Sequence, residues 1–300
     1  MAINTTGGAS ALSADGAVLT GFGGNSIAWR WTAETGVQGL GVLPGSTTSQ
    51  SEAISSDGET IVGSSGNDAF RWTAATGMTS IGIGRATGVA DNGAIVGYAN
   101  FGPGVNASGF IWTAAAGQVA ITSLAGPTGT SEANAVSDDG VFVVGRTSMP
   151  SGGIQGYIWT EAGGMINLGA FDGQTFGNAL DVSNDGSRIV GNAQGNTGLR
   201  ATVWSPDSGW QDLTYVLTAS GLNLSGWVLN VAYGISDDGR FVVGYGTHNG
   251  LNQAFQAELP TSIPQVQNPY TIPEPSVGFA ALAGVGLFCS GRFGRRRILT

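Results

Sequence analysis

Short apolar stretches alternate with turn residues along most of the chain, and residues 131–168 show the pattern in full. Small and polar residues alternate up to a turn at Asp139-Gly140, and an apolar run, residues 141–144, follows it. Gly, Asn and Asp tolerate the positive φ angles of tight hairpin turns, so these two runs predict a β-hairpin. Two further runs, residues 156–160 and 165–168, are separated by a pair of glycines. The stretch therefore predicts four short antiparallel strands.

The same unit occurs six times. Each copy has an Asp-Gly or Asn-Gly turn, and successive turns lie 42, 35, 47, 46 and 53 residues apart. An aromatic residue follows each turn in a matching context, and such a period is typical of a repeat architecture. The turns begin at Asp15, Asp57, Asn92, Asp139, Asp185 and Asp238, and the aromatic residues are Trp31, Trp72, Trp112, Trp159, Trp204 and Phe255.

Repeats of this length with four strands are typical of propeller blades. Apolar runs such as residues 142–144, 189–190 and 241–243 lack in-out alternation, which indicates strands that are covered on both faces by neighbouring blades. We therefore predict an all-β, six-bladed β-propeller over residues 1–259. A β-solenoid or a stack of sandwiches is the alternative.

The sixth copy has only three predicted strands, since it ends at residues 255–259 without a fourth. A ring needs its terminal blade completed, because open strand edges invite aggregation. Residues 1–10 also have no basic segment followed by an apolar one, as a signal peptide would. One hypothesis is that the natural protein starts upstream, with a signal peptide and a Leu-Gly strand that closes the sixth blade. Otherwise residues 4–6 or 265–270 are expected to cover that edge.

Charge is sparse and unevenly distributed. Charged residues make up 10% of the chain and glycine supplies 52 residues, which suits short strands joined by tight turns. Residues 1–275 contain 7 Arg and 20 acidic residues, a net charge of 7 − 20 = −13, whereas the remaining residues carry +4. Nucleic acid is therefore excluded as a partner, because its binding depends on basic side chains. The absence of lysine also excludes Schiff-base chemistry and a phosphate-binding P-loop.

The C-terminal region has three parts. Residues 260–275 are rich in proline and predict an extended spacer, residues 276–291 carry no charge and predict a transmembrane helix, and residues 292–300 form a basic cytoplasmic tail. This order resembles the PEP-CTERM sorting tail of exported bacterial proteins, which implies processing by an exosortase and transient insertion in the inner membrane. The sorting motif is Pro273, Glu274 and Pro275, and the arginines that stop the membrane segment are Arg292, Arg295, Arg296 and Arg297.

The repeats themselves resemble a second family. Ser-Glu-Ala-Ile-Ser-Ser-Asp-Gly at 51–58, Ala-Phe-Arg-Trp-Thr at 69–73 and Leu-Gly-Val-Leu-Pro-Gly at 40–45 are similar to the HAF-type extracellular repeat. The likeness covers residues 10–259, although no histidine precedes the Ala-Phe pairs at 69–70 and 254–255. The resemblance implies an extracellular or cell-surface location and implies no particular reaction.

No catalytic residue, metal site or cofactor is predicted. His248 is the only histidine and lies in a loop-like segment, so we interpret it as a solvated loop residue. The segment from Asp181 to Gly186 matches the first half of a calcium loop, but Asn192 stands where the bidentate Glu belongs. Paired carboxylates for glycoside hydrolysis need only two acidic residues at a suitable separation. The candidates are Glu34, Glu52, Glu132, Glu161, Asp138 and Asp237.

Two of these pairs, Glu52 with Glu132 and Asp138 with Asp237, are assigned to matching positions of the repeat and are interpreted as structural. We predict a non-enzymatic surface or matrix protein that acts as an interaction scaffold and is associated with exopolysaccharide or other surface proteins. An exported glycan-active hydrolase or lyase is the alternative. Loops carry the specificity of propellers, so a ligand face is expected among aromatic residues outside the shared pattern. These are Phe101, Phe171, Phe176, Trp210, Trp227 and Tyr233.

Overall fold

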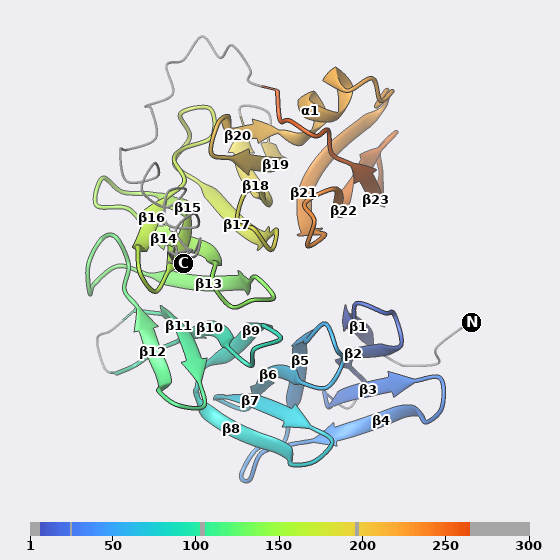
Figure 1. The fold of residues 1–300 in the computed structure, drawn as a ribbon, viewed down its shortest axis with the longest axis vertical. Helices are drawn as coiled ribbons and strands as arrows, with labels where there is room; N and C mark the ends of the chain where they lie inside the picture. Colours follow the sequence, from blue (N-terminus) through green and yellow to red (C-terminus); the bar gives the residue numbers. More distant parts are fainter. Residues whose placement is uncertain (1–6, 25, 103–105, 196–197, 265–300) are drawn as a thin grey trace, which may run out of the picture.

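The computed structural model describes residues 7–24, 26–102, 106–195 and 198–264. In these residues the chain forms six antiparallel sheets, and each sheet is built from strands that are consecutive in the sequence. Figure 1 shows the sheets arranged around a common centre, and the blades that begin with β1 (Gly8–Leu12) and β21 (Trp227–Ile235) are the first and the last of the arrangement. The prediction of a six-bladed, all-β propeller is confirmed.

Five blades have four strands and the sixth has three. The first two blades hold β1 (Gly8–Leu12), β2 (Val18–Phe22), β3 (Ala28–Thr32) and β4 (Gly36–Gly41), then β5 (Ser49–Ile54), β6 (Ile61–Ser65), β7 (Asp68–Thr73) and β8 (Gly77–Ile83). The next two hold β9 (Arg85–Val89), β10 (Ile95–Ala99), β11 (Ser108–Thr113) and β12 (Gly117–Ile121), then β13 (Ser131–Val136), β14 (Val143–Ser148), β15 (Ile154–Thr160) and β16 (Gly164–Asn167). The last two hold β17 (Gly177–Val182), β18 (Ile189–Gly195), β19 (Gly198–Ser205) and β20 (Gly209–Asp212), then β21 (Trp227–Ile235), β22 (Phe241–His248) and β23 (Leu251–Glu258), with helix α1 (Leu213–Ala219) between them.

Antiparallel strands in this order give the propeller two distinct ends. One end, which we name the turn face, carries the hairpin turns between the first and second strands of each blade, such as residues 137–142. The opposite end, which we name the loop face, carries the loops between second and third strands and the connections between blades, such as residues 100–107 and 168–176.

The predicted Asp-Gly turns are built by side-chain hydrogen bonds. In the fourth blade, Ser137 Oγ donates to Asp139 Oδ1 at 2.6 Å, and Asp139 Oδ1 accepts the amide of Val141 at 2.9 Å. Gly140 has a φ of 76°, which L side chains rarely adopt. The same Ser–Asp bond occurs in the first, second, fifth and sixth blades. The Asp-Gly pairs are therefore part of the scaffold, as the repeat pattern indicated.

Hydrophobic side chains from adjacent blades form the core. Five clusters fill the five spaces between consecutive blades, and valines in the middle of the second strands, such as Val62, Val96 and Val144, are fully buried in them. The prediction of strands covered on both faces is confirmed for Val143, Val144, Ile189 and Val190, but it is wrong for the run 241–243, where Val243 is 45% exposed. The repeated tryptophans Trp72, Trp112, Trp159 and Trp204 pack against or within these clusters.

The strand register corrects the match of Phe255 with the repeated tryptophans. Phe255 lies opposite Gly244, as Phe70 lies opposite Gly63, whereas Ala257 occupies the position of Trp72. The assignment of Phe255 to the tryptophan position is therefore wrong by two residues. The repeat period alone could not show this, because the loop between the second and third strands differs in length from copy to copy.

The structure also bears on the C-terminal region. Within the described ranges, the sixth sheet has no fourth strand, as the sequence predicted. No helix in those ranges is long and apolar enough to cross a membrane. The predicted transmembrane segment 276–291, the sorting motif and the basic tail 292–300 lie outside the described residues.

Candidate functional site

The loop face holds four of the six aromatic residues expected at a ligand face. Phe101 follows β10, Phe171 and Phe176 lie in the connection from the fourth to the fifth blade, and Trp227 begins β21. Phe101 is exposed, whereas Phe171 packs against the core between the fourth and fifth blades. Trp227 stacks on His248, with ring centroids 4.7 Å apart. His248 therefore lies at this end of the sixth blade as a stacking partner.

The remaining two aromatic residues lie elsewhere. Trp210 is only 7% exposed and belongs to the core between the fourth and fifth blades, so its ring is not available to a ligand. Tyr233 is 59% exposed and stacks with Tyr245 within the sixth blade. The six residues thus do not form one surface.

A cleft of about 310 Å³ opens on the loop face between the second and third blades. Five of its nine lining residues are polar, and the other four are glycine or alanine. The polar residues are Ser64, Asn67, Arg85, Tyr98 and Asn100. Sequence reasoning missed this cleft, because it is assembled from two different repeats.

The charge of the cleft is balanced. Arg85 makes an ion pair with Glu52 of the neighbouring blade. Burial alone would lower the pKa of Arg85, but the hydrogen bond and the charge of Glu52 raise it above its usual value. The guanidinium is therefore already paired, and the hydroxyl and amide groups around it are the groups that can bind an uncharged polar ligand.

Glu52 and Glu132 are not equivalent, contrary to the sequence assignment. Glu52 lies at an irregularity of β5, between the residues paired with Gly63 and Val62, whereas Glu132 is paired directly with Arg146. Glu132 also makes an ion pair with Arg146 at 2.7 Å. The two glutamates therefore have different partners, one across a blade interface and one within its own sheet.

Three aspartates interact on the turn face, near the first strands. Asp181 Oδ2 accepts the amide of Ile235 at 2.8 Å, which links the fifth blade to the sixth. Burial raises the pKa of Asp181 to about 7, and the charges of Asp237 and Asp138 add to this effect. Burial also raises the pKa of Asp138, and Asp237 contributes in the same direction.

These aspartates do not form a metal site. No group of three or more His, Cys, Asp or Glu side chains within the described part of the chain is placed to hold a metal ion. In the calcium-like segment, Asp181 accepts two backbone amides and Asp185 accepts hydrogen bonds from Ser183 and Ser187 within its turn. Both carboxylates therefore serve the local fold.

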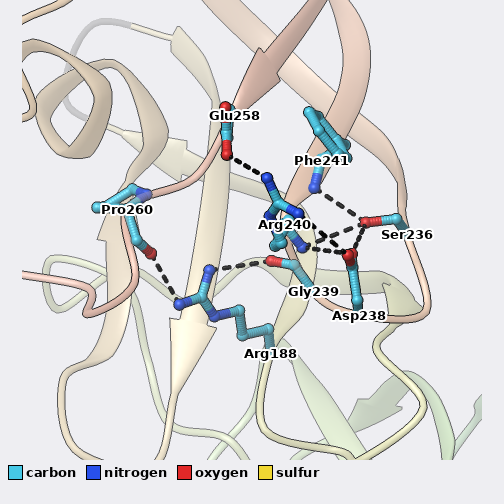
Figure 2. Close-up of polar contacts among 8 residues, drawn as sticks. All are labelled: Arg188, Ser236, Asp238, Gly239, Arg240, Phe241, Glu258 and Pro260. Carbon is cyan, nitrogen blue, oxygen red and sulfur yellow. Dashed lines mark hydrogen bonds and ion pairs between the residues drawn. The ribbon is translucent and has the colours of Figure 1, made fainter.

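The chain leaves the propeller on the turn face. After β23, Leu259 is buried and donates its amide to the carbonyl of Arg240 at 2.7 Å. Arg188 of the fifth blade donates to the carbonyl of Gly239 at 2.9 Å and to those of Pro260 and Thr261, each at 2.7 Å. Figure 2 shows Arg188 between the turn at Gly239 and the segment at Pro260. The start of the proline-rich spacer is thus held on the face opposite the cleft.

Beside these hydrogen bonds of Arg188 lies a more exposed ion pair. Arg240 donates to Glu258 at 2.8 Å across the sixth sheet, and both side chains are more than half exposed. Burial lowers the pKa of Arg188 from its usual value, in spite of the nearby charges of Asp185 and Asp238. Arg188 is therefore the partly buried member of the two arginines and the one that contacts the departing chain.

Comparison with known proteins gives the fold alone. No protein-family model and no curated protein matches the sequence. The β-propeller domain of the Trilobed protease from Pyrococcus furiosus, described as having an open velcro topology, is 13% identical with a TM-score of 0.56, over 88% of this chain and 86% of that one. A putative TolB from Agrobacterium tumefaciens is 13% identical with a TM-score of 0.53, over 86% and 91%.

Other similar structures are only partly matched. A prolyl endopeptidase is 11% identical with a TM-score of 0.55, over 85% of this chain and 42% of the peptidase. The chain also spans about half, 52%, of TolB from Acinetobacter baumannii, with 12% identity and a TM-score of 0.48. The three likenesses with TM-scores above 0.5 support the propeller architecture and leave the function to the chemistry of the surface.

Proposed function

We propose that this protein is a non-enzymatic scaffold, exported to the cell surface or extracellular matrix, whose loop face binds polysaccharide. One observation carries the proposal: Arg188 holds the departing chain at Pro260 and Thr261 on the turn face, opposite the cleft. The described chain therefore leaves the propeller on the face opposite the cleft.

The chemistry of the cleft favours an uncharged sugar. Ser64, Asn67 and Asn100 supply hydrogen-bond donors and acceptors, and Tyr98 adds an aromatic ring with a hydroxyl. Arg85 is already paired with Glu52, and the body of the protein is strongly acidic, so an anionic polymer would be repelled. A neutral exopolysaccharide is the ligand class that fits these properties.

The C-terminal region provides the proposed signal for export and processing. By resemblance to PEP-CTERM tails, residues 276–291 hold the chain in the inner membrane until an exosortase recognises Pro273-Glu274-Pro275. Mass spectrometry of the mature C-terminus tests this part of the proposal. A terminus near Pro275 is expected, and recovery of peptides that contain Phe293 from the surface fraction would contradict it.

Binding is tested with a panel of neutral and acidic glycans on an array, followed by calorimetry with the best ligand. Tyr98→Ala is expected to weaken binding about tenfold or more, because an aromatic contact in a polar cleft contributes on the order of 1–2 kcal/mol. Tyr215→Ala is the matched control, since Tyr215 is an exposed tyrosine on α1, away from the cleft. Equal binding by both variants, or no binding to any neutral glycan, would reject the cleft as the site.

The enzymatic alternative rests on the three aspartates of the turn face. A carboxyl group with a pKa of about 7, such as Asp181, could donate a proton at neutral pH, and the neighbouring Asp138 would supply the second carboxyl group. Measurement of reducing ends released from the same glycans separates the two proposals. Turnover by the protein that is abolished in Asp181→Asn would favour the hydrolase, whereas binding without turnover is expected for the scaffold.

A further inference from the structure

No residue in the described part of the chain covers the outward face of the sixth blade. In the first five blades, one residue in the middle of the second strand packs against the next blade and is 0% exposed, but its equivalent Val243 is 45% exposed. We name the junction between the sixth and first blades the seam. On its other side, Leu12 of β1 is also exposed, unlike its equivalents in the third to sixth blades. The five buried residues are Thr20, Val62, Val96, Val144 and Val190.

The position of Ala254 in the third strand shows which side chain the sixth blade lacks. The third strand of each complete blade has a small residue that is buried, and in the sixth blade its equivalent, Ala254, is exposed. In the complete blades an aliphatic residue of the fourth strand lies beside this small residue: Ile121 is paired with Gly109, and Leu168 donates its amide to the carbonyl of Gly156 at 3.0 Å. Ala254 thus marks the place of a missing aliphatic side chain.

The five fourth strands share one pattern. Each begins with a glycine of positive φ and has Leu or Ile four residues later, and these aliphatic residues are 0–8% exposed. Each packs into the core between its own blade and the next. The pairs are Gly36 and Leu40, Gly77 and Ile81, Gly117 and Ile121, Gly164 and Leu168, and Gly209 and Leu213.

The edge of β23 has little protection against pairing. β22 and β23 pair continuously over eight residues, without a bulge and without proline. Glu258 is the only charged residue of β23, and Arg240 neutralises it. Natural edge strands are usually shielded by bulges, prolines or unpaired charges, and an edge that lacks them can pair with another chain. The outer edge of β23 is therefore suited to accept a strand.

The described continuation of the chain does not occupy this edge. Leu259 to Thr261 run along the turn face to Arg188 of the fifth blade, on the side away from the seam. The fourth strands of the other blades are each paired within their own sheets. We propose that β23 accepts an extended strand of a second protein, with a Leu or Ile side chain seated beside Ala254 and against Val243.

Such a strand would complete the sixth sheet. Its backbone would satisfy the free edge of β23, which provides affinity, while the aliphatic side chain beside Ala254 provides specificity, as in other cases of strand addition. The partner is thus defined chemically as an extended segment free of proline, with Leu or Ile at the position beside Ala254 and no charge there.

The chain's own fourth strand serves as the test ligand. A labelled peptide with the sequence of residues 163–169, Gly-Gly-Met-Ile-Asn-Leu-Gly, is titrated into the full-length protein and its fluorescence anisotropy is measured. Binding is expected, and the peptide with Leu168→Asp is expected to bind at least about tenfold more weakly, because burial of the leucine side chain is lost. Hydrogen exchange should show slower exchange of the β23 amides when the peptide is bound.

Two protein variants locate the site. Ala254→Asp places a charge where the leucine would sit and is expected to weaken binding about tenfold or more. Gln253→Asp is the matched control, because it adds the same charge to the same strand at an exposed residue on its other face, and binding should be retained. Both residues are exposed, so folding should be unaffected.

The proposal is overturned by any of three results. The peptide does not bind, or it binds Ala254→Asp as well as it binds Gln253→Asp. The β23 amides that point away from β22 are already protected in the isolated protein, which would place another segment of the chain on the edge. Sedimentation shows a dimer that Ala254→Asp dissociates, which would make a second copy the occupant.

Discussion

Val144 and Val243 occupy the same position of the repeat, and comparison of their alanine variants tests whether the seam between the sixth and first blades is open in solution. Val144 is fully buried between the fourth and fifth blades, whereas Val243 is 45% exposed. Val→Ala removes two carbon groups, each contributing about 0.8 kcal/mol when buried, and the cavity adds to that loss. Val144→Ala should therefore cost about 2–3 kcal/mol, and Val243→Ala about 1 kcal/mol or less.

The two costs are measured as changes in Tm under identical conditions. With about 2–4 °C per kcal/mol for a chain of this size, Val144→Ala should lower Tm by about 4–12 °C and Val243→Ala by less than about 4 °C. Val190→Ala is a second buried reference, at the interface of the fifth and sixth blades. Equal losses for Val144→Ala and Val243→Ala would mean that Val243 is packed in solution, and the interpretation of an open seam would be refuted.

Three further predictions concern polar and backbone contacts. Arg188→Met removes three hydrogen bonds to carbonyls, so hydrogen exchange at residues 259–263 should become faster by an amount that corresponds to about 1–3 kcal/mol, whereas Arg240→Met should leave these amides nearly unchanged. Because the pKa of Asp181 rises from 3.8 to about 7 on folding, stability should fall as pH rises from about 4 to about 7, and Asp181→Asn should flatten that part of a urea-midpoint profile. Gly145→Ala should prevent normal folding, measured by circular dichroism, because its Cβ would lie 1.9 Å from the carbonyl oxygen of Glu132.

The architecture could be predicted because the repeat carries local signals. Asp139-Gly140 predicts a hairpin from residue chemistry alone, and the structure shows the same serine-supported turn in five blades. The apolar run 142–144 predicts a strand covered on both sides without knowledge of its neighbours. These signals depend on short-range geometry, so a single sequence contains them.

The cleft and the register could not be predicted in the same way. The cleft joins Asn67 to Tyr98 across two blades, and the angle between blades is not encoded in either repeat alone. Trp210 was expected at a surface because it lies outside the shared pattern, yet it fills the core between the fourth and fifth blades. A residue that departs from a repeat can thus serve packing where its own neighbours differ.

Asp181 and Arg188 of the fifth blade also differ from their equivalents in the other repeats, and both contact the sixth blade. The other blades have Ala or Gly at the position of Asp181, and none has a charged residue at the position of Arg188. Both side chains bond to the sixth blade, Asp181 to the amide of Ile235 and Arg188 to the carbonyl of Gly239. Among the described residues, no blade packs on the outward face of the sixth blade, so the interface with the fifth blade is the main packing contact of the sixth. Since the core between these two blades also includes α1, we infer that these departures from symmetry compensate for the open seam.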